Sequence, residues 1–155
     1  MSRIKSNFRP RDAFKTEWIA TKIDNDCIDY LENMGFYLTD KKDEKSRFPG
    51  RRAVTTSQLR NIFGELKRIE TLATEGWEKV DEAFQMLRPT IAYASARVLT
   101  RSRESRITDL REVLERAHSA VSNQAEDTQK VESFKRFLKF FEGILAYHKV
   151  YGGRD

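Results

Sequence analysis

Apolar residues recur at steps of three and four along most of the chain beyond residue 54, which is the spacing of one face of an α-helix. The clearest run begins at Thr55, whose hydroxyl can cap a first turn while Gln58 reaches back to the cap residue. Its apolar face carries Leu59, Ile62, Phe63, Leu66 and Ile69. A polar stripe on the flank of that face comprises Arg60, Gly64, Lys67 and Thr71. We therefore predict a helix that ends at Gly76 and carries two cations outside the core.

The same periodicity predicts three further long helices. The first spans about 77–98 and contains Pro89, which should kink or split it because proline lacks an N–H and clashes with the preceding turn. The next begins at Ser105 or Thr108. The last, over about 128–150, is apolar around more than half of its circumference. Such a helix lies either at the centre of its own bundle or partly against another chain.

Two short helices are expected ahead of these runs. One spans 12–20, and the other begins at Asp24 or Asp26 and ends at Gly35, with Cys27 on its apolar face as a small core residue. Turn-forming residues are scarce, with 7 Gly and 3 Pro, and this favours helices over many short strands. The expected fold class is all-α: a single-domain bundle of about five helices with a short N-terminal helical lead-in.

The 155 residues are enough for one domain with a core, and the pattern divides them into four parts. Residues 1–11 are polar and basic and are expected to form a flexible tail. Residues 12–38 form the helical lead-in, and residues 39–53, which show no periodicity, form a basic loop. Residues 54–153 form the helical bundle core.

The net charge of +5 permits a polyanionic partner, and the cations gather near the Thr55 helix. Two arginines end the basic loop, two cations lie on the polar stripe, and two arginines follow Tyr93 at steps of four on the next helix. The candidate nucleic-acid-binding residues are therefore Arg51, Arg52, Arg60, Lys67, Arg97 and Arg101. Two alternatives stay open: these cations form a solvated surface, and Tyr93 is a buried ring with a bonded hydroxyl instead of a ring that stacks on bases.

Catalytic signatures are lacking in the sequence. The two histidines, His118 and His148, fall on different predicted helices; we expect His118 at the surface and His148 as a hydrogen-bonded structural residue. There is no zinc-type Cys or His spacing and no glycine-rich phosphate loop. We therefore expect no enzyme activity, no metal and no cofactor, although dispersed acidic residues that meet in three dimensions stay open as a metal site.

The expected location is the cytoplasm. The single cysteine, Cys27, cannot form an internal disulfide, which favours a reducing compartment. No run approaches the roughly 18 apolar residues that cross a bilayer, so no membrane partner is expected.

Three segments resemble a known family in their order and spacing. They are Thr55 to Arg60 (TTSQLR), Leu87 to Arg97 (LRPTIAYASAR) and Phe141 to Gly153 (FEGILAYHKVYGG). Together, over about residues 53–153, they are similar to the small helical subunit of the prokaryotic type III-A CRISPR effector, the Csm complex.

The resemblance implies a non-catalytic subunit, several copies of which stack along the inside of a ribonucleoprotein filament. Such a subunit lines the groove where guide RNA and target RNA pair, contacts their backbone and helps to assemble the filament. Its implied partners are the target RNA and guide RNA, the repeated backbone subunits, the large polymerase-domain subunit and other copies of itself. The alternative is a pure protein scaffold, in which the basic residues contact neighbouring subunits instead of RNA.

Overall fold

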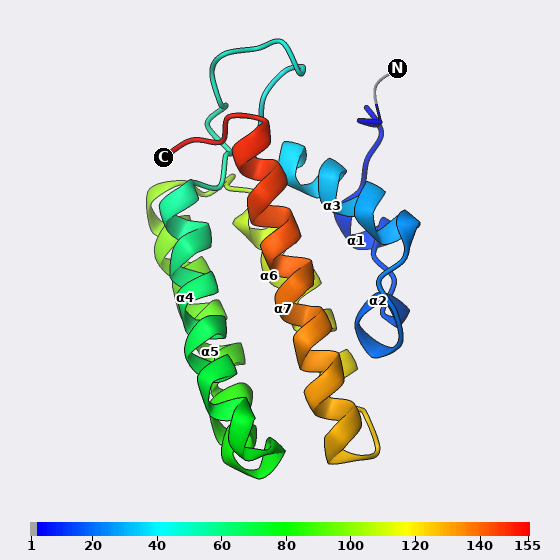
Figure 1. The fold of residues 1–155 in the computed structure, drawn as a ribbon. Coiled ribbons are helices and arrows are strands. Elements are labelled where there is room, and N and C mark those ends of the chain that lie inside the picture. The colour runs from blue at the N-terminus through cyan, green and yellow to red at the C-terminus, as the bar shows by residue number, and fades with distance from the viewer. Residues whose placement is uncertain (1–2) are drawn as a thin grey trace.

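The computed structural model describes residues 3–155, which form seven α-helices, one 3₁₀ turn and no strand within that range (Figure 1). The elements are α1 (Pro10–Ala13), α2 (Glu17–Ala20), α3 (Asn25–Tyr37), α4 (Thr56–Leu72), η1 (Ala73–Glu75), α5 (Trp77–Arg101), α6 (Ile107–Ser122) and α7 (Asp127–Val150). The prediction of an all-α bundle is confirmed. Over residues 3–155, no helix is long and apolar enough to cross a membrane.

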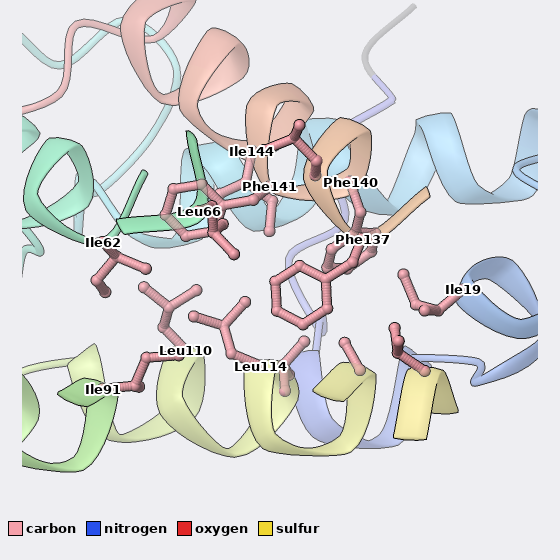
Figure 2. Packing of buried hydrophobic residues seen from close by; sticks show 14 of the residues in the cluster. Ile19, Ile62, Leu66, Ile91, Leu110, Leu114, Phe137, Phe140, Phe141 and Ile144 are labelled. Atoms are coloured by element: carbon pink, nitrogen blue, oxygen red, sulfur yellow. The ribbon is translucent and has the colours of Figure 1, made fainter. Parts of the chain in front are cut away.

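The last helix, α7, is the centre of the bundle and packs against α2, α3, α4, α5 and α6. Four phenylalanines of α7 are at most 1% exposed: Phe134, Phe137, Phe140 and Phe141. Figure 2 shows the aromatic side chains of α7 meeting aliphatic ones from α4, α5 and α6. The broad apolar face is therefore buried within this chain, and the alternative that it lies partly against another chain is wrong for these four rings.

The start of α4 has the predicted capping box. The Thr55 hydroxyl oxygen accepts a hydrogen bond from the Gln58 backbone N–H at 3.1 Å, and the Gln58 side-chain oxygen accepts one from the Thr55 N–H at 2.9 Å. The apolar face behind it is buried, with Phe63 half-buried and stacked on Phe141. Gly76 then separates η1 from α5 with a φ of +97°, which a glycine adopts without strain.

Pro89 was predicted to kink or split this helix; α5 continues through Pro89 without a break, so the split is wrong. Pro89 lies on the exposed face of α5. Because proline has no N–H, one helix carbonyl lacks its usual donor, and on this face water can take the donor's place. Leu87 and Ile91 on either side are each only 2% exposed. Both side chains belong to the core cluster, so the helix is packed on either side of Pro89.

Helix α3 begins as predicted but runs past its predicted end. The Asp24 carboxylate accepts a hydrogen bond from the Cys27 N–H at 2.9 Å, and Cys27 is fully buried. Burial, and then the nearby charge of Asp24, raises the pKa of the Cys27 thiol to about 12. Gly35 does not stop the helix, which ends at Tyr37. It is instead a point of close approach between α3 and α7.

The lead-in also differs from the prediction. The single helix expected over 12–20 is two short helices, α1 and α2, although its apolar residues are buried as expected: Phe14, Trp18 and Ile19. Residues 1 and 2 of the expected flexible tail lie outside the described part of the chain. The rest of that segment lies along α3, since the Lys5 N–H donates to the Asn33 side-chain oxygen at 2.8 Å and Phe8 packs edge-on against Tyr30.

Both histidines are buried. His118 was expected at the surface and is only 2% exposed, with its ring stacked on Phe84 and Nε2 2.8 Å from the Phe84 carbonyl oxygen. His148 is a bonded structural residue, as predicted, with Nε2 2.8 Å from the carbonyl oxygen of Val54. His148 thereby ties α7 to the segment that leads into α4.

Candidate nucleic-acid interface

The antiparallel packing of α4 and α5 brings the start of α4 and the end of α5 to one end of the bundle, where the basic loop also lies (Figure 1). The loop is attached there by its backbone. The Ser102 hydroxyl donates to the carbonyl oxygen of Arg51 at 3.3 Å, and the Arg106 N–H donates to that of Arg52 at 2.8 Å. Five of the six predicted cations gather at this end, and Lys67 lies about 10 Å further along α4 than Arg60.

A hollow of about 270 Å³ lies between α4 and α5 near this end. Its apolar floor includes Ile62 and Val98, and two predicted arginines, Arg97 and Arg101, line it. A guanidinium presents several N–H donors in a plane that matches two oxygens of one phosphate. The edge of this hollow can therefore bind an oxyanion from outside the chain.

Arg60, Arg97 and Arg101 carry exposed guanidiniums. Within residues 3–155, no carboxylate forms an ion pair with any of these three side chains. Their charge is therefore not compensated by a neighbour in the chain. We call these three residues together with Arg51 the basic end.

Tyr93 is 67% exposed, so the alternative of a buried ring with a bonded hydroxyl is wrong. The Arg97 guanidinium carbon lies 5.9 Å from the centre of the Tyr93 ring, within the range of a cation–π contact. The ring and the cation share one exposed face of α5, one turn apart.

Lys67 is less free than the arginines. Its ammonium lies 2.7 Å from a carboxylate oxygen of Glu70, one turn along α4, and this hydrogen bond raises the pKa of Lys67. The pair is exposed to solvent, where such contacts are weak and are screened by salt. Lys67 can exchange Glu70 for another anion, but it starts from a paired state.

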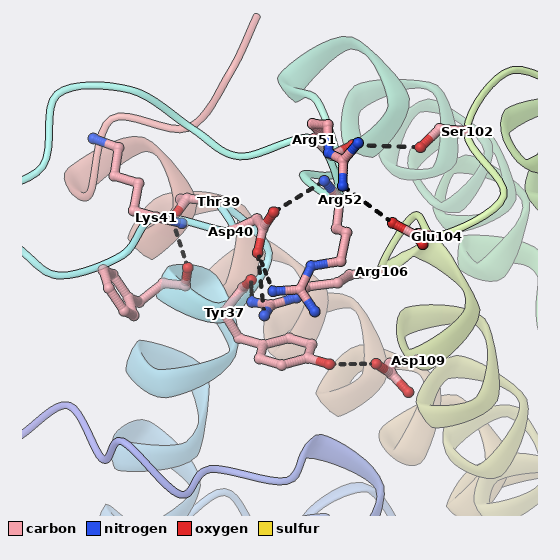
Figure 3. Close-up of polar contacts among 11 residues, drawn as sticks. Tyr37, Thr39, Asp40, Lys41, Arg51, Arg52, Ser102, Glu104, Arg106 and Asp109 are labelled. Carbon is pink, nitrogen blue, oxygen red and sulfur yellow. Dashed lines mark hydrogen bonds and ion pairs between the residues drawn. The ribbon is translucent and has the colours of Figure 1, made fainter.

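The two arginines of the basic loop have different surroundings (Figure 3). The Arg52 guanidinium lies 2.9 Å from one carboxylate oxygen of Asp40, and the Arg52 N–H donates to the other at 3.0 Å. Arg51 has a side chain that is 92% exposed and lies only loosely, at 3.8 Å, from the exposed Glu104. Arg51 is thus available to a partner, whereas Arg52 holds the loop in place.

The Asp40 carboxylate also binds Arg106, at 3.2 Å, and Arg106 lies flat over the Tyr37 ring, 4.0 Å from its centre. Burial lowers the pKa of Arg106, while burial and a hydrogen bond to Asp109 raise the pKa of Tyr37 to about 12. The sequence pattern does not single out Asp40 or Arg106. Their roles depend on the closure of the loop, which periodicity does not detect.

The sequence left open a metal site formed by dispersed acidic residues that meet in three dimensions. Within residues 3–155, no three His, Cys, Asp or Glu side chains lie together as metal ligands would. The acidic residues near the basic end, such as Asp40 and Glu104, instead lie against arginines.

A family model matches most of the chain. No curated protein and no solved structure matches the chain. The model of the family described as Csm2 Type III-A matches residues 37–154, which span the basic loop and the helices α4 to α7. This range covers well over half of the chain and includes all six predicted cations, so the chain belongs to the Csm2 family, small subunits of the type III-A Csm complex.

Proposed function

We propose that the chain is a non-catalytic subunit that contacts the backbone of the paired guide RNA and target RNA through its basic end. The observation that supports this most directly is the set of unpaired arginines at one end of the bundle. Arg97 and Arg101 line one hollow, and Arg60 precedes Asn61, which also lines it. None of the three arginines has a carboxylate partner within residues 3–155. Uncompensated guanidiniums on a rigid helical support suit phosphate binding.

The contact is independent of sequence. Each guanidinium neutralises a phosphate and releases counterions, while base pairing by the guide RNA supplies the specificity. Arg51 adds a further phosphate contact from the basic loop, and Lys67 adds one by exchanging Glu70 for a phosphate. Arg52 acts indirectly, because its pairing with Asp40 positions the loop.

The partners of this function are the other components of the complex. We propose that the chain packs against the repeated backbone subunits, the large polymerase-domain subunit and further copies of itself in the prokaryotic cytoplasm, and that it needs no cofactor. Cleavage is then left to those other subunits.

The test is a salt series of target-RNA binding by the reconstituted complex, with the wild-type chain and with Arg60, Arg97 and Arg101 changed together to alanine. We expect normal assembly, weaker binding and a shallower dependence of log K on log salt, by about 0.7 for each lost phosphate contact with a single strand. The matched control changes Lys79, Lys130 and Lys135, near the opposite end of the bundle, to alanine (Figure 1). An unchanged slope in the arginine variant would contradict the proposal.

A protein scaffold is the second candidate function. Met86 and Tyr93 are 57% and 67% exposed and lie seven residues apart, which places both on one face of α5. Two exposed apolar side chains on one helix face favour a contact with another subunit. A scaffold predicts that the triple arginine variant fails to assemble or binds RNA with the wild-type slope, and that Met86→Ala weakens assembly.

A further inference from the structure

The basic loop carries one large apolar side chain, Phe48, and it is 79% exposed. Its neighbours in the chain are cations on one side, Lys45 and Arg47, and a Pro-Gly turn on the other. The ring belongs neither to the buried core cluster nor to the partly buried side chains that pack against it.

The attachment of the loop fixes where this ring is presented. The Gly50 N–H donates to the carbonyl oxygen of Thr39 at 3.3 Å, so the chain returns to its starting point two residues after Phe48. A Cβ atom at Gly50 would lie 2.1 Å from a carboxylate oxygen of Asp40, so only glycine fits this closure. Phe48 therefore lies two residues from the point where the loop closes, the contact of Gly50 with Thr39. We call this closure the neck of the loop.

The loop projects beyond the end of the bundle where α4 begins and α5 ends (Figure 1). Arg51, Arg97 and Arg101 lie at this same end, so the exposed ring and three exposed cations lie at one end of the bundle. Proteins that bind single-stranded nucleic acid without sequence preference combine these two features, cations along the backbone and an aromatic ring on which a base stacks.

We propose that Phe48 stacks on an unpaired base of the RNA whose backbone the basic end holds. This inference rests on the proposed function and adds a residue that contacts a base to those that contact phosphates. A base that is stacked within a duplex has no free face, so the ring acts on an unpaired or displaced nucleotide. A single ring among cations matches this partner better than an apolar protein surface, which would require neighbouring apolar side chains that the loop sequence lacks.

The first test measures RNA binding by the reconstituted complex with Phe48→Ala, Phe48→Leu and Phe48→Trp. We expect roughly tenfold weaker binding for alanine and leucine, and retained binding for tryptophan, because stacking requires an aromatic face. The salt slope should not change in any of the three, since the ring carries no charge. Val150→Ala, which truncates another exposed apolar side chain, is the matched control and should bind as the wild type does.

The second test uses the emission of the full-length Phe48→Trp chain, titrated with single-stranded oligoadenylate. The natural tryptophans, Trp18 and Trp77, are 2% and 4% exposed, so a change in emission reports on position 48. We expect oligoadenylate to quench the emission. A base-free sugar–phosphate oligomer of the same length should leave it unchanged, and equal quenching by both would overturn the stacking proposal.

The outcomes separate this inference from the proposed function. If the arginine variant lowers the salt slope while every Phe48 variant binds RNA as the wild type does, stacking is overturned and the phosphate contacts stand. If Phe48→Ala prevents the chain from joining the complex, the ring contacts a protein and the inference is overturned. If neither set of variants changes RNA binding, both proposals are overturned.

Discussion

Asp40 and Arg52 close the neck of the basic loop through two contacts of one carboxylate. One oxygen of Asp40 lies 2.9 Å from the Arg52 guanidinium, and the other accepts the Arg52 backbone N–H at 3.0 Å. Asp40 has a φ of +51° and its side chain is only 10% exposed. A short-chain polar residue tolerates this backbone conformation better than most others do.

We therefore expect Asp40→Ala to lower the free energy of unfolding by about 2–3 kcal/mol, because Arg106 loses its carboxylate and alanine is strained at this φ. Asp40→Asn is the matched variant. It keeps an acceptor for the Arg52 N–H and tolerates the φ, so it should lose only about 1–2 kcal/mol. Urea unfolding at pH 7.5 measures both. Wild-type stability in Asp40→Ala would contradict the role of the carboxylate.

Gly35 lies where the backbones of α3 and the central helix α7 come close together. A Cβ atom there would lie 2.6 Å from Cβ of Tyr147 and 2.7 Å from the backbone nitrogen of His148. Because backbone atoms cannot move aside as a side chain can, Gly35→Ala must push the two helices apart. We expect a loss of about 1–3 kcal/mol in the free energy of unfolding, measured by urea unfolding. A neutral effect would show that α3 can shift without loss of packing.

An alanine at Gly64 should have the opposite effect on the free energy of unfolding. Gly64 lies on the exposed polar stripe of α4, and a Cβ atom there would meet no described atom within 4 Å apart from its chain neighbours and the adjacent helix backbone. Because glycine weakens a helix interior, Gly64→Ala should stabilise the isolated chain by up to about 1 kcal/mol. The same urea experiment measures this gain, and a destabilised variant would contradict it. In the reconstituted complex, a stabilised chain that binds RNA less tightly would place a partner against this glycine.

The long helices were predictable because each carries its own local signals. The capping box of Thr55 and Gln58 and the cap at Asp24 depend only on residues three positions apart. The position of Gly35 within α3 was not predictable in this way, since the reason for a glycine there is Tyr147, more than 100 residues away. The packing of the N-terminal segment was not predictable for the same reason, because it depends on the contact of Phe8 with Tyr30 on α3.

The expected surface position of His118 was wrong for a different reason. It follows Leu114 by four residues, so the periodicity that places Leu114 in the core also places His118 there. Its polar side chain suggested the surface, although one carbonyl, that of Phe84, is enough to satisfy its N–H. For the candidate site, the helical wheel located the exposed faces of α4 and α5. The helical wheel could not predict that Arg52 pairs with Asp40, because this ion pair depends on the closed loop.

The two buried histidines, His118 and His148, should make the free energy of unfolding depend on pH. A carbonyl oxygen only accepts hydrogen bonds, so the Nε2–H group of each ring donates to its carbonyl partner. Each ring must therefore bind its next proton at Nδ1. Among residues 3–155, Nδ1 of His148 is buried without a hydrogen-bond partner. Burial lowers the pKa of both rings, against a partial opposing effect of the hydrogen bond to the carbonyl.

Because the folded pKa values of His118 and His148 lie below the unfolded value of about 6.5, the unfolded chain takes up two protons that the folded chain excludes. Stability should therefore be full above pH 6.5 and fall as the pH drops below it, by at most about 1.4 kcal/mol per pH unit for each ring. Urea unfolding between pH 7.5 and 5.5 measures the fall. The double variant His118→Gln, His148→Gln keeps a donor for each carbonyl and should lose less stability over this range. An equally steep fall in that variant would assign the pH dependence to other groups.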